Sequence, residues 1–97
     1  MADFRAGFFR ILQPKLLLME FPQYRRYKNG ASLFRIDSPT RFEEIRKLGN
    51  RWLVRAYEVK ILPDRNLVND LLFDYQGFAD LVDSEAYEAV RAVAVPE

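Results

Sequence analysis

The chain has 97 residues, of which 49% are hydrophobic and 30% charged, and it contains neither cysteine nor histidine. A chain of this length forms a single domain with one modest core. The missing residue types exclude disulfides, thiolate metal ligands, cysteine nucleophiles and histidine bases. Nothing in this composition requires an oxidising compartment, so we expect a cytoplasmic protein with no cofactor.

Charge is divided unevenly along the chain, although the formal net charge is only +1. Residues 1–63 contain thirteen Lys and Arg against six Asp and Glu, whereas residues 64–97 contain two against eight. One interpretation is that a basic sheet and acidic helices attract each other within the domain. The other is that two oppositely charged surfaces serve two partners or head-to-tail self-association.

The first eighteen residues have a pattern of their own. Their apolar side chains are interrupted by arginines, and Pro14 breaks any helix. The longest apolar run, residues 16–19, is too short for a membrane span or a signal peptide. We therefore expect no membrane partner, a dispensable extension over residues 1–18, and one domain over residues 19–97. A chain that begins at Met19 should then keep its thermal midpoint.

The dipeptide Asn29-Gly30 predicts a tight hairpin, because a type I′ turn needs positive φ at both central residues. Counting outward from this turn sets Arg25 opposite Phe34 and Tyr24 opposite Arg35. Each of these pairs places an arginine beside an aromatic ring. The flanking strands are predicted near 24–28 and 32–37.

The segment 41–48 has two interpretations. Thr40 and Glu43 form a possible capping box for a helix that Gly49 would end. Alternatively, Gly49-Asn50 turns a hairpin in one register with favourable cross-strand pairs. Those pairs are Phe42 with Tyr57, Ile45 with Val54, Glu44 with Arg55 and Arg41 with Glu58. We favour the hairpin, which gives strands near 41–47 and 51–61, but the pattern leaves the helix open.

Beyond this strand the apolar spacing predicts a helix from Arg65 to about Asp74. Its apolar stripe consists of Leu67, Val68, Leu71, Leu72 and Tyr75. Pro63 is expected to end the strand and Asp64 to cap the helix. A short strand or extended link over 78–82 and a last helix near 85–94, capped by Asp83 or Ser84, complete the chain.

The predicted fold class is α+β. An antiparallel four-stranded β-meander is packed on one face by the helix near 65–74, with the C-terminal helix near 85–94 beside it. Two short helices would leave some apolar sheet side chains uncovered. The sheet would also keep an open edge, which favours self-association.

Two groups of residues are candidate binding sites. A basic aromatic surface would carry cations for phosphates and rings for stacked bases, or else these residues serve only as cross-strand and edge partners. Its members are Arg25, Arg26, Tyr27, Arg35, Trp52 and Arg55. Asp64 and Arg65 stand at a strand-to-helix corner. The free amides of the helix start would bind an anion there, or the corner is simply a cap and a turn.

No catalytic and no metal-binding residue is predicted. The carboxylates are scattered without calcium-loop spacing, and no lysine forms a motif with a serine. The leading hypothesis is a non-catalytic protein-interaction module, self-associating as a homodimer or bound to another protein. The alternative is a single-stranded nucleic-acid binder, and a metal-dependent carboxylate enzyme ranks third.

Overall fold

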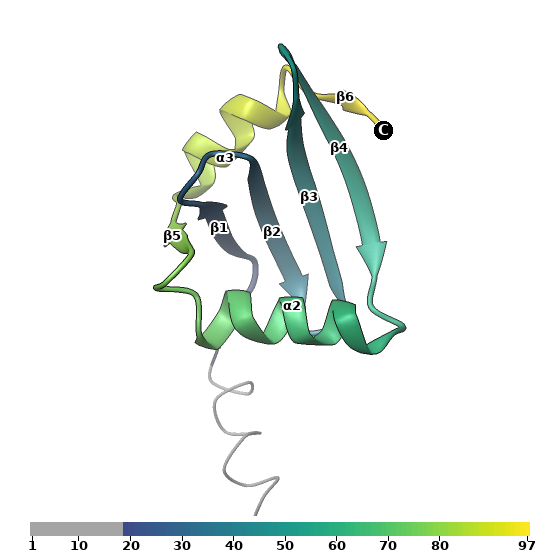
Figure 1. Ribbon diagram of the computed structural model, residues 1–97, viewed down its shortest axis with the longest axis vertical. Helices are drawn as coiled ribbons and strands as arrows, with labels where there is room; N and C mark the ends of the chain where they lie inside the picture. Colours follow the sequence, from purple (N-terminus) through teal and green to yellow (C-terminus); the bar gives the residue numbers. More distant parts are fainter. Residues whose placement is uncertain (1–18) are drawn as a thin grey trace, which may run out of the picture.

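The computed structural model describes residues 19–97 as one sheet packed by two helices (Figure 1). The predictions about residues 1–18 lie outside this range. The antiparallel meander consists of β1 (Gln23–Tyr27), β2 (Ser32–Ser38), β3 (Arg41–Leu48) and β4 (Arg51–Glu58). The remaining elements are α2 (Leu62–Phe73), β5 (Ala79–Leu81), α3 (Ser84–Arg91) and β6 (Val95–Pro96). The predicted α+β fold is confirmed.

Residues 41–48 form strand β3, so the hairpin interpretation was correct. All four predicted cross-strand pairs occur: Phe42 with Tyr57, Ile45 with Val54, Glu44 with Arg55 and Arg41 with Glu58. Gly49 closes the turn with a φ of 62°, which a residue without Cβ adopts at little cost. Complementary cross-strand partners along the whole register outweigh the helix-capping signals at either end of the segment.

The β1–β2 pairing is also as predicted, with Arg25 opposite Phe34 and Tyr24 opposite Arg35. The turn type differs from the prediction. Gly30 has a φ of 75°, and no other residue type has positive φ among those described. The Gly30 amide instead donates to the Tyr27 carbonyl at 2.9 Å. Asn29 contributes its side chain, whose Oδ1 accepts from the Ala31 amide at 2.9 Å.

Helix α2 begins earlier than predicted. Pro63 lies in its first turn, where a missing amide costs nothing. Strand β4 has already ended at Glu58, so Pro63 starts the helix and does not end the strand. Ile61 is the N-cap residue and makes no side-chain cap bond. The predicted cap at Asp64 was therefore wrong, and this carboxylate lies within the first turn, near the positive end of the helix dipole.

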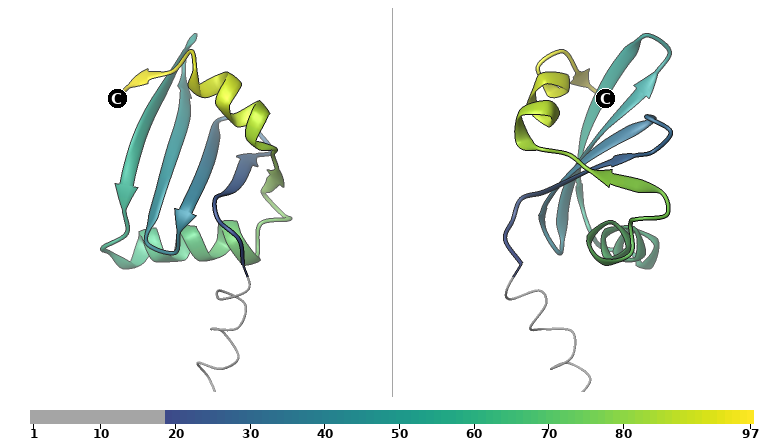
Figure 2. Two further views of the ribbon diagram at one scale, coloured as in Figure 1. Left: turned by 180° about the vertical axis from the view of Figure 1, so that it is seen from behind. Right: turned by 90° about the vertical axis from the view of Figure 1, so that its left-hand side faces the viewer.

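The two helices lie on opposite faces of the sheet, as the edge-on view in Figure 2 shows. Alternate side chains of a strand point to opposite faces. Phe34, Ile36 and Phe42 form one buried cluster with Val68, Leu71 and Leu72 of α2. Leu33 and Ile45 form the other with Tyr87 of α3. The expectation that the helices lie side by side was wrong, and each face has its own helix.

The C-terminal part returns to both edges of the sheet. Strand β5 pairs with β1, and β6 pairs in parallel with β4, giving the order β5-β1-β2-β3-β4-β6. Of the two predicted caps, Asp83 is the N-cap of α3, and its Oδ1 accepts from the Ala86 amide at 2.7 Å. The sequence pattern did not predict β6. Within residues 19–97 no helix is long and apolar enough to cross a membrane.

Candidate interaction surface

The predicted basic aromatic surface is divided between the two faces of the sheet. Arg25 is buried, and its Nε donates to the Leu71 carbonyl of α2 at 2.8 Å. Its guanidinium carbon lies 4.3 Å from the centre of the Tyr75 ring. Burial lowers the pKa of Arg25, although the charge of Tyr75 acts in the opposite direction. Arg25 therefore connects β1 to α2 and is not available to an external ligand.

Arg35 and Trp52 lie on the face that α3 covers. The Arg35 side chain is close to Asp37 (Nε to Oδ1, 2.9 Å) and Glu43 (NH1 to Oε1, 3.6 Å). Trp52 is half-buried against the cluster around Tyr87. Both residues therefore have partners within the fold.

The other three predicted residues are more accessible, but they do not form one surface. Arg26 and Arg55 are exposed and point to opposite faces, as the strand register requires. Tyr27 packs edge-on against Phe34, with ring centres 4.9 Å apart. Arg55 lies over the ring of Tyr57 at 4.9 Å. The structure thus divides the six predicted residues between the two faces, each with two of the arginines and one ring.

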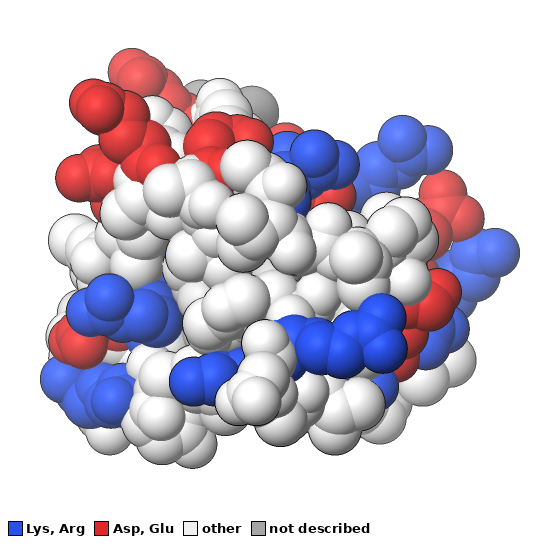
Figure 3. Space-filling view, turned by 90° about the horizontal axis from the view of Figure 1, so that it is seen from above, with Lys and Arg blue, Asp and Glu red and all other residues white. Residues whose placement is uncertain are grey.

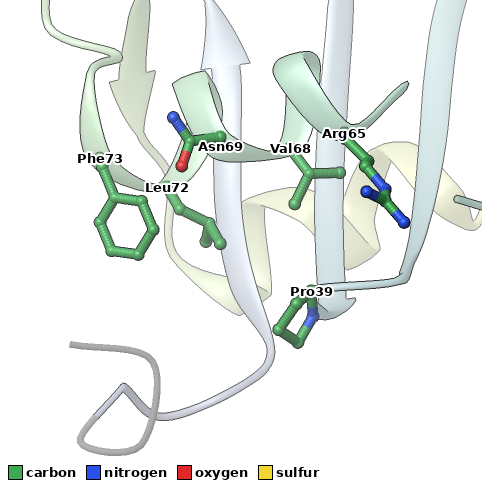
Figure 4. A pocket seen from close by; sticks show the side chains of 6 residues that line it. All are labelled: Pro39, Arg65, Val68, Asn69, Leu72 and Phe73. Carbon is green, nitrogen blue, oxygen red and sulfur yellow. The ribbon is translucent and has the colours of Figure 1, made fainter. Parts of the chain in front are cut away.

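Asp64 and Arg65 do lie at the corner that follows β4. Arg65 lines a pocket of about 140 Å³ between α2 and the β2–β3 turn (Figure 4). Pro39 contributes the opposite wall, and Val68, Asn69, Leu72 and Phe73 complete the lining. Asp64 does not line this pocket. The pocket is mainly apolar and carries only one cation, so it provides little for an anionic ligand.

Glu43 is the centre of a buried polar network between β3 and α3. Its Oε1 accepts from the Tyr87 hydroxyl and from the Arg91 Nε, both at 2.8 Å. Burial would raise the pKa of Glu43, but the hydrogen bonds from Arg91 and Tyr87 and the charges of Arg35 and Arg91 together lower it. Burial, followed by the bond to Glu43, raises the pKa of Tyr87. The network holds α3 on the sheet.

The remaining polar groups also make local contacts. The Ser32 hydroxyl donates to Glu44 Oε2 at 2.6 Å, and no basic side chain completes a nucleophilic arrangement there. In the described part of the chain no three acidic side chains come together as a metal site would need. Seen from above, the acidic side chains gather mainly at one corner of the molecule (Figure 3).

Strand β4 has an edge that the structure leaves partly free. At its upper end in Figure 1, where the strand begins, the Val54 carbonyl accepts from the Glu97 amide at 3.0 Å, towards β6. At its lower end the Val59 amide donates to the Thr40 carbonyl at 2.7 Å, towards the β2–β3 turn. In an antiparallel ladder the backbone groups of successive residues alternate in direction. The backbone N–H and C=O groups of the even-numbered residues of β4 therefore point away from β3.

The backbone groups of Ala56 and Glu58 consequently point outwards. Strand β6 pairs only with Leu53 and Val54, and within residues 19–97 no backbone group pairs with the outer side of Ala56 or Glu58. The opposite edge of the sheet is the three-residue strand β5, and short edges accept partners poorly. The outer edge of β4 is the longer free edge.

Exposed apolar side chains stand at both ends of this free edge. Ile61 and Leu62, at the beginning of α2, are 58% and 65% exposed. Val95, which pairs with Leu53 near the upper end of β4, is 37% exposed, and Val93, two residues before it in the chain, is 68% exposed. The sequence predicted that an edge would remain open, but it did not indicate which residues would form it. The exposed apolar pair at 61–62 is the signal that was missed.

Comparison with protein-family models, with curated proteins and with solved structures found no match to this chain.

Proposed function

We propose that this protein is a non-catalytic interaction module that associates with itself through its sheet. The free outer edge of β4 carries this proposal. Unpaired strand edges present rows of backbone donors and acceptors that pair readily with another strand. The exposed apolar residues at both ends of the edge add surface that loses contact with water on association.

The chemistry of the polar side chains agrees with a binding role. Buried ionisable groups with shifted pKa values often mark active sites. Here the buried carboxylate of Glu43 is used to attach α3, and the buried guanidinium of Arg25 is used to attach α2. Both groups therefore have a structural use that needs no substrate.

Analytical ultracentrifugation over a wide concentration range tests self-association. We expect the average mass to rise from that of one chain to that of two. Because the proposed contact consists of backbone hydrogen bonds and apolar side chains, raising the salt concentration should change the association little. A chain that stays monomeric at the highest concentration that can be prepared would remove the proposal.

Single-stranded nucleic-acid binding remains the alternative prediction. It would require Arg26 and Arg55, the accessible members of the predicted surface, and its affinity would fall steeply with salt. A gel-shift titration of the wild type against the variant Arg26→Ala/Arg55→Ala distinguishes the two functions. Salt-sensitive binding that the double variant loses would favour nucleic-acid binding over self-association.

A further inference from the structure

We infer that two copies of the chain join their β4 strands antiparallel about a twofold axis at Tyr57, which makes one continuous sheet. This inference rests on the proposed self-association and specifies its geometry. The occupant of the free edge is a second copy because the edge is complementary to itself. Its hydrogen-bond pattern and its apolar ends each match under a twofold rotation.

The hydrogen-bond pattern selects the register. In the part of the chain that the structure describes, Ala56 and Glu58 present free backbone groups on the outer side, and β6 occupies the edge at Leu53 and Val54. When Tyr57 lies on the axis, Ala56 faces Glu58 of the partner subunit in a hydrogen-bonded pair. By the same rotation, Glu58 faces Ala56 of the partner subunit in a second hydrogen-bonded pair. A register centred on Ala56 would instead pair Glu58, within β4, with Val54 of the partner subunit, whose carbonyl already accepts from Glu97. In the Tyr57 register the residue opposite Val54 is Lys60, which follows the end of β4 at Glu58.

Tyr57 then meets Tyr57 of the partner subunit as a non-hydrogen-bonded pair, the closer of the two antiparallel arrangements. Its ring is already held in place, stacked on Phe42 with ring centres 4.8 Å apart. The guanidinium of Arg55 lies over the same ring at 4.9 Å. A rigid, half-buried aromatic ring loses little conformational freedom when it forms such a contact.

The apolar ends of the edge match as well. A twofold axis between antiparallel strands sets the lower end of one β4 beside the upper end of the other. Ile61 and Leu62 follow the lower end at the start of α2, whereas β6, with Val95 opposite Leu53, pairs along the upper end (Figure 1). Val93 lies two residues before Val95 in the chain. The rotation therefore brings each exposed apolar pair towards its counterpart on the partner. These are four of the six large apolar side chains that are exposed in residues 19–97.

The register has one unfavourable feature, which the fold offsets. Glu58 comes diagonal to Glu58 of the partner subunit on the face that carries α3. Each Glu58 already has two cations beside it. Arg41 NH2 lies 3.6 Å from its Oε2, and Lys60 Nζ lies 3.4 Å from its Oε1. The paired carboxylates therefore repel each other less than bare charges would.

Disulfide trapping tests the axis directly, because the chain contains no cysteine. We expect Tyr57→Cys to form a covalent dimer under mild oxidation, since non-hydrogen-bonded partners lie within disulfide reach. The matched control is Arg55→Cys, which is on the same strand and face. In the proposed register the two substituted thiols of this control are about 13 Å apart along the strand and cannot join. Equal trapping of the two variants would overturn the register.

A second cysteine experiment leaves Tyr57 unchanged, because Tyr57→Cys also removes the stacking contact with Phe42. Ala56→Cys and Glu58→Cys are single changes at exposed positions. We expect a mixture of the two variants to form a heterodimeric disulfide, because the proposed register makes Ala56 and Glu58 direct partners. Each variant alone should form much less. A disulfide yield that is no higher in the mixture contradicts the inference.

Proline substitution tests the hydrogen bonds. Ala56→Pro removes an amide that points away from β3, so the β3–β4 ladder remains intact. We expect it to weaken dimerisation at least about tenfold, because one hydrogen bond is lost on each subunit. Ala56→Val keeps the amide and should dimerise like the wild type. Circular dichroism of all variants confirms that they are folded.

These experiments separate failure of the geometry from failure of the function. If the wild type dimerises, but Ala56→Pro dimerises equally well and no cysteine variant is trapped, the contact lies elsewhere. Self-association would then stand and the β4 axis would be wrong. A wild type that remains monomeric throughout overturns both.

Discussion

The two helices hold opposite faces of the same sheet with different chemistry. On the α2 side, Leu71 and Phe34 are fully buried within an apolar cluster. On the α3 side, fully buried Tyr87 places its hydroxyl against the carboxylate of Glu43, which also receives Arg91. The first contact depends on the area of apolar surface removed from water. The second depends on a buried charge keeping its partners.

This contrast suggests that the two contacts respond to different changes. Apolar packing is sensitive to the volume of a side chain and insensitive to protonation. The Glu43 network is sensitive to protonation and to the loss of any donor. Each variant below changes one of these properties, and the effects are given from the largest to the smallest.

Leu71→Ala should have the largest effect. We expect the free energy of unfolding to fall by about 2–5 kcal/mol, because a cavity remains where a fully buried side chain was removed. Urea denaturation followed by circular dichroism measures the loss. The control on the same helix is Leu62→Ala, at a side chain that is 65% exposed. Equal losses for the two variants would contradict the assignment of the α2 core.

Glu43→Gln should have a smaller effect that is confined to the α3 side. Its carboxylate side chain is 7% exposed, so removing the charge weakens bonds that water does not replace. We expect a loss of about 1–3 kcal/mol in the free energy of unfolding. Glu85→Gln, which changes an exposed acid on α3 itself, serves as the control. The same denaturation measurement applies, and an unchanged midpoint for Glu43→Gln would show that the network contributes nothing.

The pH dependence should distinguish the two sides. The pKa of Glu43 is lowered in the folded state from its ordinary value of 4.5, so the unfolded chain binds this proton more readily. The stability that Glu43 contributes is therefore present above pH 4.5 and is lost as the pH falls through the lowered pKa.

Urea titrations at several pH values between neutrality and strong acid would measure this effect. We expect Glu43→Gln to lose less stability on acidification than the wild type does. Leu71→Ala should keep the full pH dependence of the wild type, because it changes no charge. Identical acid sensitivity in Glu43→Gln and the wild type would refute the role of this carboxylate.

The smallest effect is expected for an ion pair outside both clusters. Lys28 Nζ lies 2.9 Å from Asp80 Oδ1, and the two side chains are 51% and 44% exposed. Lys28→Met should change the free energy of unfolding by about 0–1 kcal/mol. A thermal melt of this variant beside Glu43→Gln compares an exposed charge pair with a network centred on a buried carboxylate. A loss as large as that of Glu43→Gln would mean that burial does not set the strength of these contacts.

Much of the fold was predictable because its signals are local. The pairs Phe42 with Tyr57 and Arg25 with Phe34 follow from counting outward from two glycine turns. The stripe containing Leu71 and Leu72 identified α2 and its buried side. The errors fell at element ends, such as Pro63, where one residue type is compatible with either a strand end or a helix start.

The candidate site was predicted less well than the fold. Arg25 and Arg35 were grouped with exposed cations, although one is buried against α2 and the other is paired with acids near α3. Exposure and partners depend on which helix covers which face, and a single strand's pattern does not carry that information. The free edge at Ala56 and Glu58 was missed for the same reason, because it depends on where β6 stops pairing.

The sequence by itself indicated the four strands of the meander, their register and the two helices, because these depend on side-chain periodicity, turn residues and neighbouring cross-strand pairs. The tertiary structure alone decided that the helices take opposite faces, that Glu43 meets Tyr87, and that β4 is left partly unpaired. These features join segments far apart in the chain. They are settled by how the whole molecule buries its apolar surface and satisfies its buried polar groups, which no local pattern encodes.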